Sequence, residues 1–147
     1  MSLLEKLKSD IITSMKEKNK ERLNTLRSVK GAMQLEIINN KKEENDDLLL
    51  DVINKQIKMR NDSIAEFEKA GREDLVKSYK QEIDILMEYM PEMLSEEELN
   101  KIIDNQIAKL EEKSPKSLGI IMREITPVIK NRCDMREVTN KIKEKLS

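Results

Sequence analysis

The stretch from Lys55 to Leu75, KQIKMRNDSIAEFEKAGREDL, decides the fold of this chain. Its apolar residues recur at helical spacing, but a cationic residue, Arg60, occupies one position of this apolar stripe. Gly71 then ends the helix, because glycine readily takes the left-handed conformation that follows a helix C-terminus. A second periodic run begins at once. The stretch therefore predicts two long antiparallel helices, here called the hairpin, with an arginine on their seam.

The composition favours long helices and argues against a sheet. Charged residues make up 39% of the chain, whereas the aromatic residues are limited to Phe67, Tyr79 and Tyr89. Strands are rich in aromatic and β-branched residues, so this composition predicts an all-α protein. Histidine is absent, which removes the commonest metal ligand and the commonest general base.

Three features bear on the compartment of the protein. The single cysteine, Cys133, excludes an internal disulfide and fits a reducing compartment. No apolar run is long enough to span a membrane. Residues 1–15 include two acidic side chains and lack the apolar core of a signal peptide. We therefore expect a cytoplasmic protein that does not associate with a membrane.

Helical periodicity predicts seven amphipathic helices in two domains. Four of them precede Pro91, and the third and fourth form the hairpin. Residues 1–92 are expected to be an N-terminal helical hairpin domain, and residues 93–147 a small three-helix C-terminal domain. A unit of about 50 residues is only marginally stable alone. We therefore expect it to rest on the first four helices or on a partner.

Residues that favour helix ends mark the boundaries of these helices. Pro127 falls inside the pattern of the sixth helix, where it predicts a kink or an early end. The predicted N-cap residues are Ser2, Asp46 or Asp47, Ser95, Ser117 and Asp134.

Arg60 and Glu82 lie at equal offsets from Gly71, 11 residues before it and 11 residues after it. In an antiparallel hairpin that turns at Gly71 the two side chains come side by side. We interpret them as a structural ion pair that fixes the register of the hairpin. The alternative is functional: Arg60, Arg27 and Arg72 together form a pocket for an anion. Of the two, we favour the structural interpretation.

No catalytic site, metal site or cofactor is expected. Most of the carboxylates fall in the first turns of predicted helices, where they complement the helix dipole. Cys133 has no histidine partner, and the chain lacks a glycine-rich phosphate loop and a zinc-binding cluster. No small-molecule substrate is evident either. Independent enzymatic activity is therefore not expected.

The C-terminal part of the chain carries an excess of positive charge. Residues 113–147 hold nine basic and four acidic residues, whereas residues 95–112 hold two basic and six acidic residues. This asymmetry has two interpretations. One is an ordinary charged helical surface, which charge alone favours, and the other is a basic face for a phosphate-bearing partner.

Gly119 adds a second indication within this basic region. It falls in the first turn of a predicted helix, where glycine lowers helix stability, so another backbone is expected to approach it closely. That neighbour is either the adjacent helix, which we favour, or a nucleic-acid strand. No aromatic residue follows Tyr89, so such binding reads the backbone rather than the bases. The candidate nucleic-acid-binding residues are Lys116, Gly119, Arg123, Lys130, Arg132 and Arg136, with Lys141 as a further cation.

Eight short segments along nearly the whole chain form an ordered series that is more specific than any one of them. They are RLNTLR at 22–27, KMRNDSI at 58–64, AGREDL at 70–75, EI at 82–83, EYMP at 88–91, LSEEEL at 94–99, GIIM at 119–122 and NRCD at 131–134. The series resembles the YqeY family, which shares its C-terminal region with the tail of the GatB subunit of glutamyl/aspartyl-tRNA amidotransferases. The chain departs from the usual family residues at Leu118, Tyr79, Asn131 and Cys133.

The resemblance implies a helical hairpin domain followed by a GatB-tail-like domain. In the amidotransferase that tail is associated with holding tRNA, while the amidation chemistry resides elsewhere. Our leading hypothesis is a non-catalytic tRNA-associated protein, whose C-terminal domain binds tRNA or a tRNA-handling enzyme and whose hairpin serves as an arm or scaffold. Two alternatives remain: a protein–protein adaptor whose hairpin offers a groove to another helix, and an accessory subunit of a carbon–nitrogen ligase with glutamine as amido-N-donor.

Overall fold

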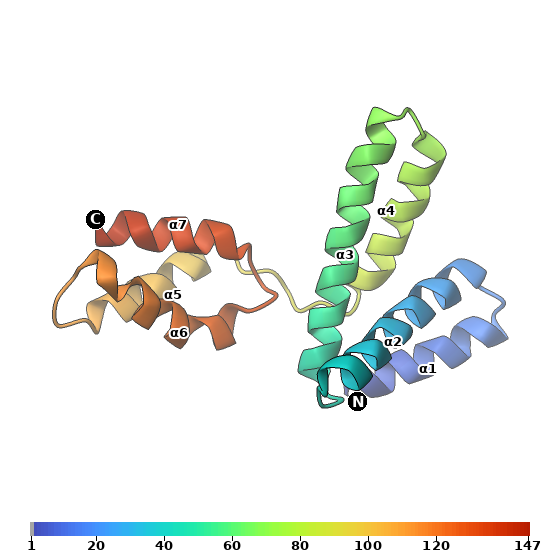
Figure 1. Cartoon of the computed structure of the whole chain (residues 1–147), viewed down its shortest axis with the longest axis horizontal. Coiled ribbons are helices and arrows are strands. Elements are labelled where there is room, and N and C mark those ends of the chain that lie inside the picture. Colours follow the sequence, from blue (N-terminus) through green and yellow to red (C-terminus); the bar gives the residue numbers. More distant parts are fainter. Residues whose placement is uncertain (1) are drawn as a thin grey trace. The chain divides into compact units, whose positions relative to one another are not determined.

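The computed structural model describes residues 2–147 of the chain (Figure 1). Within this part the chain forms seven α-helices and one short 3-10 helix, and none of these residues lies in a strand. The prediction of an all-α protein is therefore confirmed. The elements are α1 Leu3–Lys16, α2 Lys20–Asn40, α3 Asp46–Lys69, α4 Glu73–Met87, α5 Glu96–Ala108, η1 Pro115–Ser117, α6 Leu118–Ile129 and α7 Met135–Leu146.

The chain folds into two compact units, Met1–Met90 with α1 to α4 and Pro91–Ser147 with α5 to α7. Each unit has its own core of mainly aliphatic side chains, whose burial drives folding. The first core consists of Leu7, Ile11, Leu26, Val29, Met33, Leu48, Leu49, Val52, Ile53, Leu86 and Tyr89. The second consists of Leu99, Ile103, Ile121, Ile125, Ile129, Val138, Ile142 and Leu146.

In the first unit, α3 and α4 lie side by side and run antiparallel (Figure 1). Gly71 makes the turn between them in the left-handed conformation expected from the sequence, with a φ of 70°. Two backbone hydrogen bonds close the end of α3. Gly71 N donates to Glu68 O at 3.2 Å, and Arg72 N donates to Phe67 O at 2.9 Å. This pair of bonds is a Schellman motif, which satisfies carbonyls that a helix end leaves free.

The predicted N-cap of α3 is wrong by one position. Asn45, rather than Asp46 or Asp47, caps the helix, because its Oδ1 accepts a hydrogen bond from Leu48 N at 2.9 Å. Asp46 lies in the first turn and reaches the start of α1 instead, where its Oδ1 accepts a hydrogen bond from Leu4 N at 3.1 Å. The carboxylate thus satisfies a free N–H group of a different helix.

The predicted N-cap of α6 is also wrong. Ser117 makes no capping hydrogen bond with its side chain, because the chain enters α6 directly from η1. Ser114 caps η1 in its place, and its Oγ accepts a hydrogen bond from Lys116 N at 3.1 Å. At the other end, α6 continues through Pro127 and ends two residues later, at Ile129.

In the second unit, α6 packs against both α5 and α7. The segment before α5 is attached to the turn between α6 and α7, since Leu94 N donates a hydrogen bond to Arg132 O at 2.8 Å. This bond joins the beginning of the unit to its middle. The three helices are therefore held by the shared core and by this backbone contact.

Candidate nucleic-acid interface

The start of α6 and the turn before it carry three of the predicted nucleic-acid contacts. Lys116, Gly119 and Arg123 are all exposed. Gly119 and Arg123 share a helix face, because they are four residues apart. Among the described residues neither Lys116 nor Arg123 forms an ion pair. Both cations are thus available to an anionic ligand.

The space around Gly119 is open. Apart from Gly119 itself, its two chain neighbours and the adjacent backbone of α6, no described heavy atom lies within 4 Å of the position that a Cβ atom would occupy. The favoured prediction, that the adjacent helix approaches Gly119, is therefore wrong. The reason is the orientation of α6, which packs on its neighbours through Ile121 and Ile125 and turns Gly119 outward. Approach by an outside backbone is the alternative that this geometry permits.

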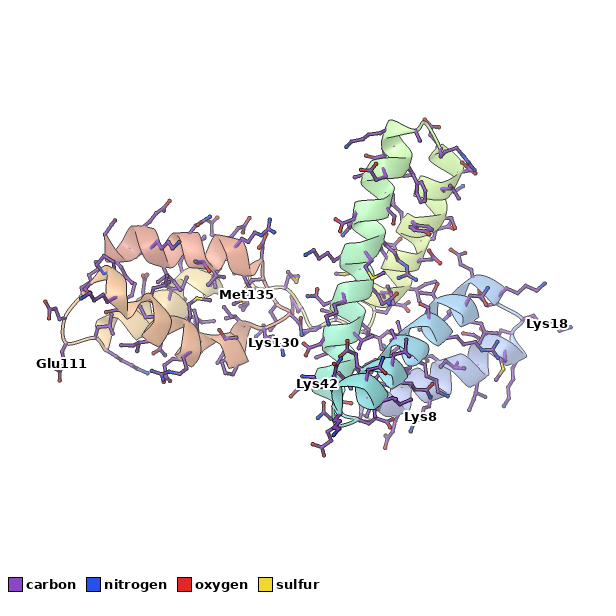
Figure 2. All side chains as sticks on the ribbon, in the orientation of Figure 1. Lys8, Lys18, Lys42, Glu111, Lys130 and Met135 are labelled. Carbon is purple, nitrogen blue, oxygen red and sulfur yellow. The ribbon has the colours of Figure 1, made fainter. Side chains whose placement is uncertain are left out.

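Lys130 and Arg132 lie farther along, in the turn between α6 and α7. Figure 2 labels Lys130 in this turn. Asn131 between them has a φ of 64°, a left-handed conformation that asparagine tolerates better than most residues. Lys130 is exposed. Arg132 is half-buried, and its Nε donates a hydrogen bond to Glu92 O at 3.1 Å. Part of the Arg132 guanidinium therefore holds the segment before α5 in place.

Arg136 is exposed in the first turn of α7. Together with Met135, Thr139 and Asn140 it lines an open groove of about 400 Å³. The six predicted contact residues thus occupy three places: the start of α6, the turn after it, and the start of α7. The three at the start of α6 are spaced three and four residues apart, so they lie on one side of this segment.

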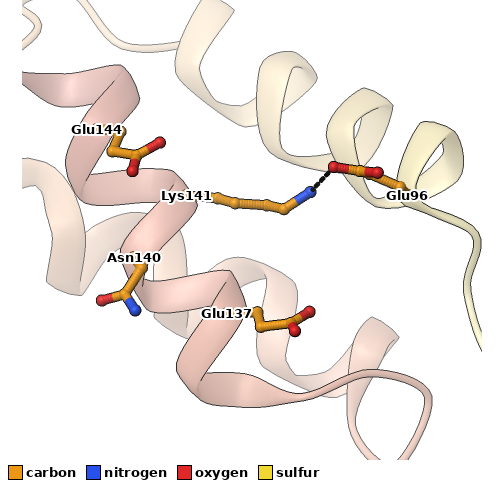
Figure 3. A pocket seen from close by; sticks show the side chains of 5 residues that line it. All are labelled: Glu96, Glu137, Asn140, Lys141 and Glu144. Carbon is orange, nitrogen blue, oxygen red and sulfur yellow. Dashed lines mark hydrogen bonds and ion pairs between the residues drawn. The ribbon is translucent and has the colours of Figure 1, made fainter.

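Lys141 is engaged within the unit and does not join the candidate interface. Its Nζ lies 3.1 Å from Glu96 Oε1 and 3.4 Å from Asn100 Oδ1, across a groove of about 480 Å³ between α5 and α7 (Figure 3). Lys145 makes a similar pair with Asp104 at 2.6 Å. The acidic α5 and the basic α7 thus partly neutralise one another. Part of the charge difference between these two stretches of sequence is therefore used in ion pairs within the unit.

Arg60 on α3 lies at the centre of a polar contact among three helices. Its Nε is 3.5 Å from Oε2 of Glu82 on α4, and its Nη2 donates a hydrogen bond to Oγ of Ser28 on α2 at 3.2 Å. Its Nη1 donates to Oε1 of Gln56 at 2.6 Å. The side chains of Arg60 and Glu82 are 12% and 22% exposed, so water screens the pair only weakly.

The arginines of the alternative anion pocket are not gathered in one place. Arg27 donates a hydrogen bond to Met15 Sδ at 3.3 Å. Arg72 pairs with Asp74 at 3.1 Å, beside the hairpin turn. Arg60 is held by the contacts just described. Since each arginine has its own partner among the described residues, these contacts do not support a shared anion pocket.

The sequence does not predict a second polar cluster, which joins α1, α2 and the end of α4. Arg22 lies between Asp10 and Glu88, with N–O distances of 3.4 Å and 2.6 Å. The Tyr89 hydroxyl donates a hydrogen bond to the same Asp10 carboxylate. Lys6 Nζ lies 4.6 Å from the centre of the Tyr89 ring. The hydrogen bond to Glu88 raises the pKa of Arg22, so the guanidinium stays charged.

Replacing Tyr89 with phenylalanine should reduce the loss of stability at alkaline pH. Burial of the phenol, with a further contribution from the Asp10 carboxylate, raises the pKa of Tyr89. Above about pH 10 the unfolded chain releases this proton while the folded protein keeps it. The free energy of unfolding therefore falls with rising pH, by up to about 1.4 kcal/mol per pH unit from this group. Urea unfolding of both proteins from about pH 9 to about pH 11 measures the slopes, and identical slopes would contradict this account.

Among residues 2–147, no three His, Cys, Asp or Glu side chains are arranged so that they could hold a metal ion. Cys133 is half-buried, and burial raises the pKa of its thiol, so it lacks the features of an activated nucleophile. None of the described helices is both long enough and apolar enough to cross a membrane.

Comparison with known proteins identifies the family. The family model described as Yqey-like protein matches residues 4–146. The chain belongs to the YqeY family. Its curated relatives include the protein named "Altered inheritance of mitochondria protein 41, mitochondrial" of Pyrenophora tritici-repentis, which is 37% identical over 97% of this chain and 80% of the relative. The protein of the same name from Kluyveromyces lactis is 37% identical over 74% of this chain and 60% of the relative.

The YqeY match confirms the resemblance that the eight sequence segments indicate. The match to the Saccharomyces cerevisiae relative spans 56% of that protein's length, less than the 80% seen for the Pyrenophora relative.

The comparison contradicts the prediction of a cytoplasmic protein, because these relatives are named as mitochondrial proteins. The single cysteine indicated a reducing compartment but did not distinguish one such compartment from another.

Proposed function

We propose that this YqeY-family protein is a non-catalytic, tRNA-associated protein whose C-terminal unit contacts the RNA backbone. The observation that carries the proposal is the exposure of Lys116, Gly119 and Arg123, here called the α6 surface, together with the open space beside Gly119. The likeness of the C-terminal region to the GatB tail is the reason for naming tRNA as the RNA. In this proposal the α3–α4 hairpin serves as a scaffold.

The chemistry of the α6 surface suits a phosphate backbone. Lys116 and Arg123 are exposed and form no ion pair with a described residue, and each phosphate that they neutralise releases bound counterions from the RNA. Gly119 lies in the first turn of α6, and because it has no side chain it leaves the helix backbone there accessible to an approaching strand.

The turn after α6 and the start of α7 supply the remaining contacts of the proposal. Lys130 and Arg136 are exposed, and Arg132 uses its Nε internally while its two terminal nitrogens remain donors. No aromatic residue follows Tyr89, so the unit has no ring on which a base stacks. The proposed binding therefore reads the shape and charge of the backbone.

Charge reversal on the α6 surface should weaken tRNA binding. The double variant Lys116→Glu, Arg123→Glu removes two phosphate contacts and adds two repulsive charges, so we expect the Kd at low salt to rise about tenfold or more. The slope of log K against log salt concentration should become shallower by roughly 1.4 to 1.8. An electrophoretic binding assay with total tRNA, run across a salt series, measures both quantities.

Lys101→Glu is the matched control for this experiment. Lys101 is an exposed lysine of α5 in the same unit, and its ion pair with Glu97 spans 4.0 Å in solvent. Its reversal should leave the Kd nearly unchanged. If affinity for tRNA is independent of salt and survives the double reversal, the proposal fails.

A further inference from the structure

The helix α2 carries exposed apolar side chains on the side opposite its core. Leu35 and Ile38 are 60% and 73% exposed, although α2 also buries Leu26, Val29 and Met33. A surface helix normally has one apolar stripe and a polar outer face. Because α2 is apolar on two sides, its outer side differs from an ordinary solvated helix face.

The neighbouring helix α1 also carries exposed apolar side chains. Ile12 and Met15 of α1 are 49% and 45% exposed. Arg27 of α2 donates a hydrogen bond to Met15 Sδ at 3.3 Å, so the two helices meet at this point. We call the exposed side of these helices, around Ile12, Met15, Leu35 and Ile38, the α1–α2 surface.

The charges that surround the α1–α2 surface are predominantly positive. Lys8, Arg27 and Lys30 are exposed, and Lys8 and Lys30 line the same shallow hollow between α1 and α2. Glu44 also lines this hollow, but it lies 3.9 Å from Lys8 and both side chains are solvated. Such a pair holds its members weakly. The edge of the α1–α2 surface therefore presents cationic side chains to an acidic partner.

Gly31 lies in the middle of α2, one helical turn from both Arg27 and Leu35. It is exposed, and apart from its chain neighbours and the adjacent backbone of α2 no described heavy atom lies within 4 Å of the position of its missing Cβ. Glycine inside a helix lowers its stability relative to alanine, and no contact of the described chain makes use of this glycine. A second helix packed against α2 at this point would make use of it, because small residues let two helix backbones approach closely.

We propose that the α1–α2 surface binds an amphipathic helix of a partner protein, whose apolar stripe is flanked by acidic residues. The apolar side chains of the partner pack on Leu35 and Ile38, and its backbone crosses α2 at Gly31. Its carboxylates face Arg27 and Lys30. This site lies in the first unit and is independent of the proposed RNA contact in the second.

A membrane or a nucleic acid uses fewer of these features. An anionic membrane gains from large apolar side chains and cations, but it gains nothing from a glycine at the centre of the surface. A nucleic acid gains phosphate contacts from the cations, but nothing from the exposed Leu35 and Ile38. A helix with acidic flanks uses the apolar residues, the cations and Gly31 together.

Two synthetic helical peptides test the proposal with the full-length protein. They share one Leu/Ile stripe, and one is flanked by glutamates while the other is flanked by lysines. Fluorescence anisotropy should show micromolar binding of the glutamate peptide and binding of the lysine peptide that is at least about tenfold weaker. The substitutions Leu35→Glu and Gly31→Leu should each weaken binding of the glutamate peptide about tenfold or more. Met59→Glu on α3 is the matched control, because Met59 is also 60% exposed, and it should bind like the wild type.

Several outcomes overturn the proposal. The first is equal binding of the two peptides, and the second is the absence of binding of either peptide at a peptide concentration of about 1 mM. The third is an equal affinity of the Leu35→Glu and Met59→Glu variants for the glutamate peptide. Sedimentation with phosphatidylglycerol vesicles that Leu35→Glu abolishes, without peptide binding, would assign the surface to a membrane and overturn it as well. Thermal melts of the variants establish that a loss of binding is not a loss of fold.

Discussion

Replacing Arg60 with alanine should lower the free energy of unfolding of the N-terminal unit by about 3 kcal/mol. The guanidinium joins three helices through its contacts with Ser28, Gln56 and Glu82. Without it, the Glu82 carboxylate, which is 22% exposed, loses its cation. A largely buried charge without a partner costs several kcal/mol. The loss of hydrogen bonds to Ser28 and Gln56 adds to this cost.

Thermal unfolding followed by circular dichroism measures the effect of Arg60→Ala. A loss of about 3 kcal/mol corresponds to a fall in Tm of roughly 15 °C for a unit of this size. Arg72→Ala is the matched control, because the Arg72–Asp74 pair lies in solvent and should contribute little. Equal changes in Tm for the two variants would show that Arg60 does not hold the helices together.

The double variant Arg60→Met, Glu82→Leu separates the effect of the unpaired charge on stability from the effect of lost side-chain packing. It removes both charges at once, so no carboxylate is left without its cation, and apolar side chains fill a similar volume. Its Tm should therefore lie well above that of Arg60→Ala. A double variant as unstable as Arg60→Ala would assign the effect to the lost hydrogen bonds with Ser28 and Gln56.

Replacing Ile103 with alanine should unfold the C-terminal unit near physiological temperature. Ile103 is fully buried in the core shared by α5, α6 and α7. Truncating a buried isoleucine to alanine costs about 2–5 kcal/mol. A core of this size rarely supplies more than about 3–5 kcal/mol of net stability. One substitution therefore consumes most of the stability of the unit.

Circular dichroism and backbone NMR of the full-length Ile103→Ala variant test this expectation. The helices α5, α6 and α7 hold about one third of the helical residues, so the helical signal should fall by about that share. Amide resonances of α1 to α4 should persist. Ile120→Ala is the control, since Ile120 is 48% exposed on α6. If Ile103→Ala retains the amide resonances of α5, α6 and α7, the core assigned to this unit is wrong.

The turn at Gly71 shows what the sequence determines through local chemistry. Glycine next to two periodic runs predicted a left-handed residue, and the structure has one there. The helix caps show the limit of such reasoning. Asn45, Asp46 and Asp47 are adjacent and each is a good N-cap residue, so only the path of the chain decides which one caps α3.

The cluster around Arg22 was beyond local reasoning, because it depends on how three helices meet. Tyr89 and Asp10 are 79 residues apart in the sequence, and their hydrogen bond forms only once α1 packs beside the end of α4. A signal was nevertheless present. Arg22 lies four residues before the buried Leu26, and Tyr89 lies three residues after the buried Leu86, so both fall on core-facing sides.

The C-terminal cations show the same division between composition and geometry. The sequence supplied the basic residues, but their availability depends on which acidic side chains lie opposite them. Lys141 and Lys145 meet carboxylates of α5, whereas Lys116 and Arg123 meet none among the described residues. Likewise, the sequence marked Gly119 as unusual but did not reveal that it faces open space.

The proposed RNA contact is tested most directly by NMR of the full-length, isotope-labelled protein titrated with tRNA. We expect backbone amide shifts and line broadening to concentrate at the α6 surface and to extend to residues 130–136, with the amides of α3 and α4 unaffected. Perturbations confined to α1–α4, or none at concentrations where tRNA binding is saturated, would contradict it.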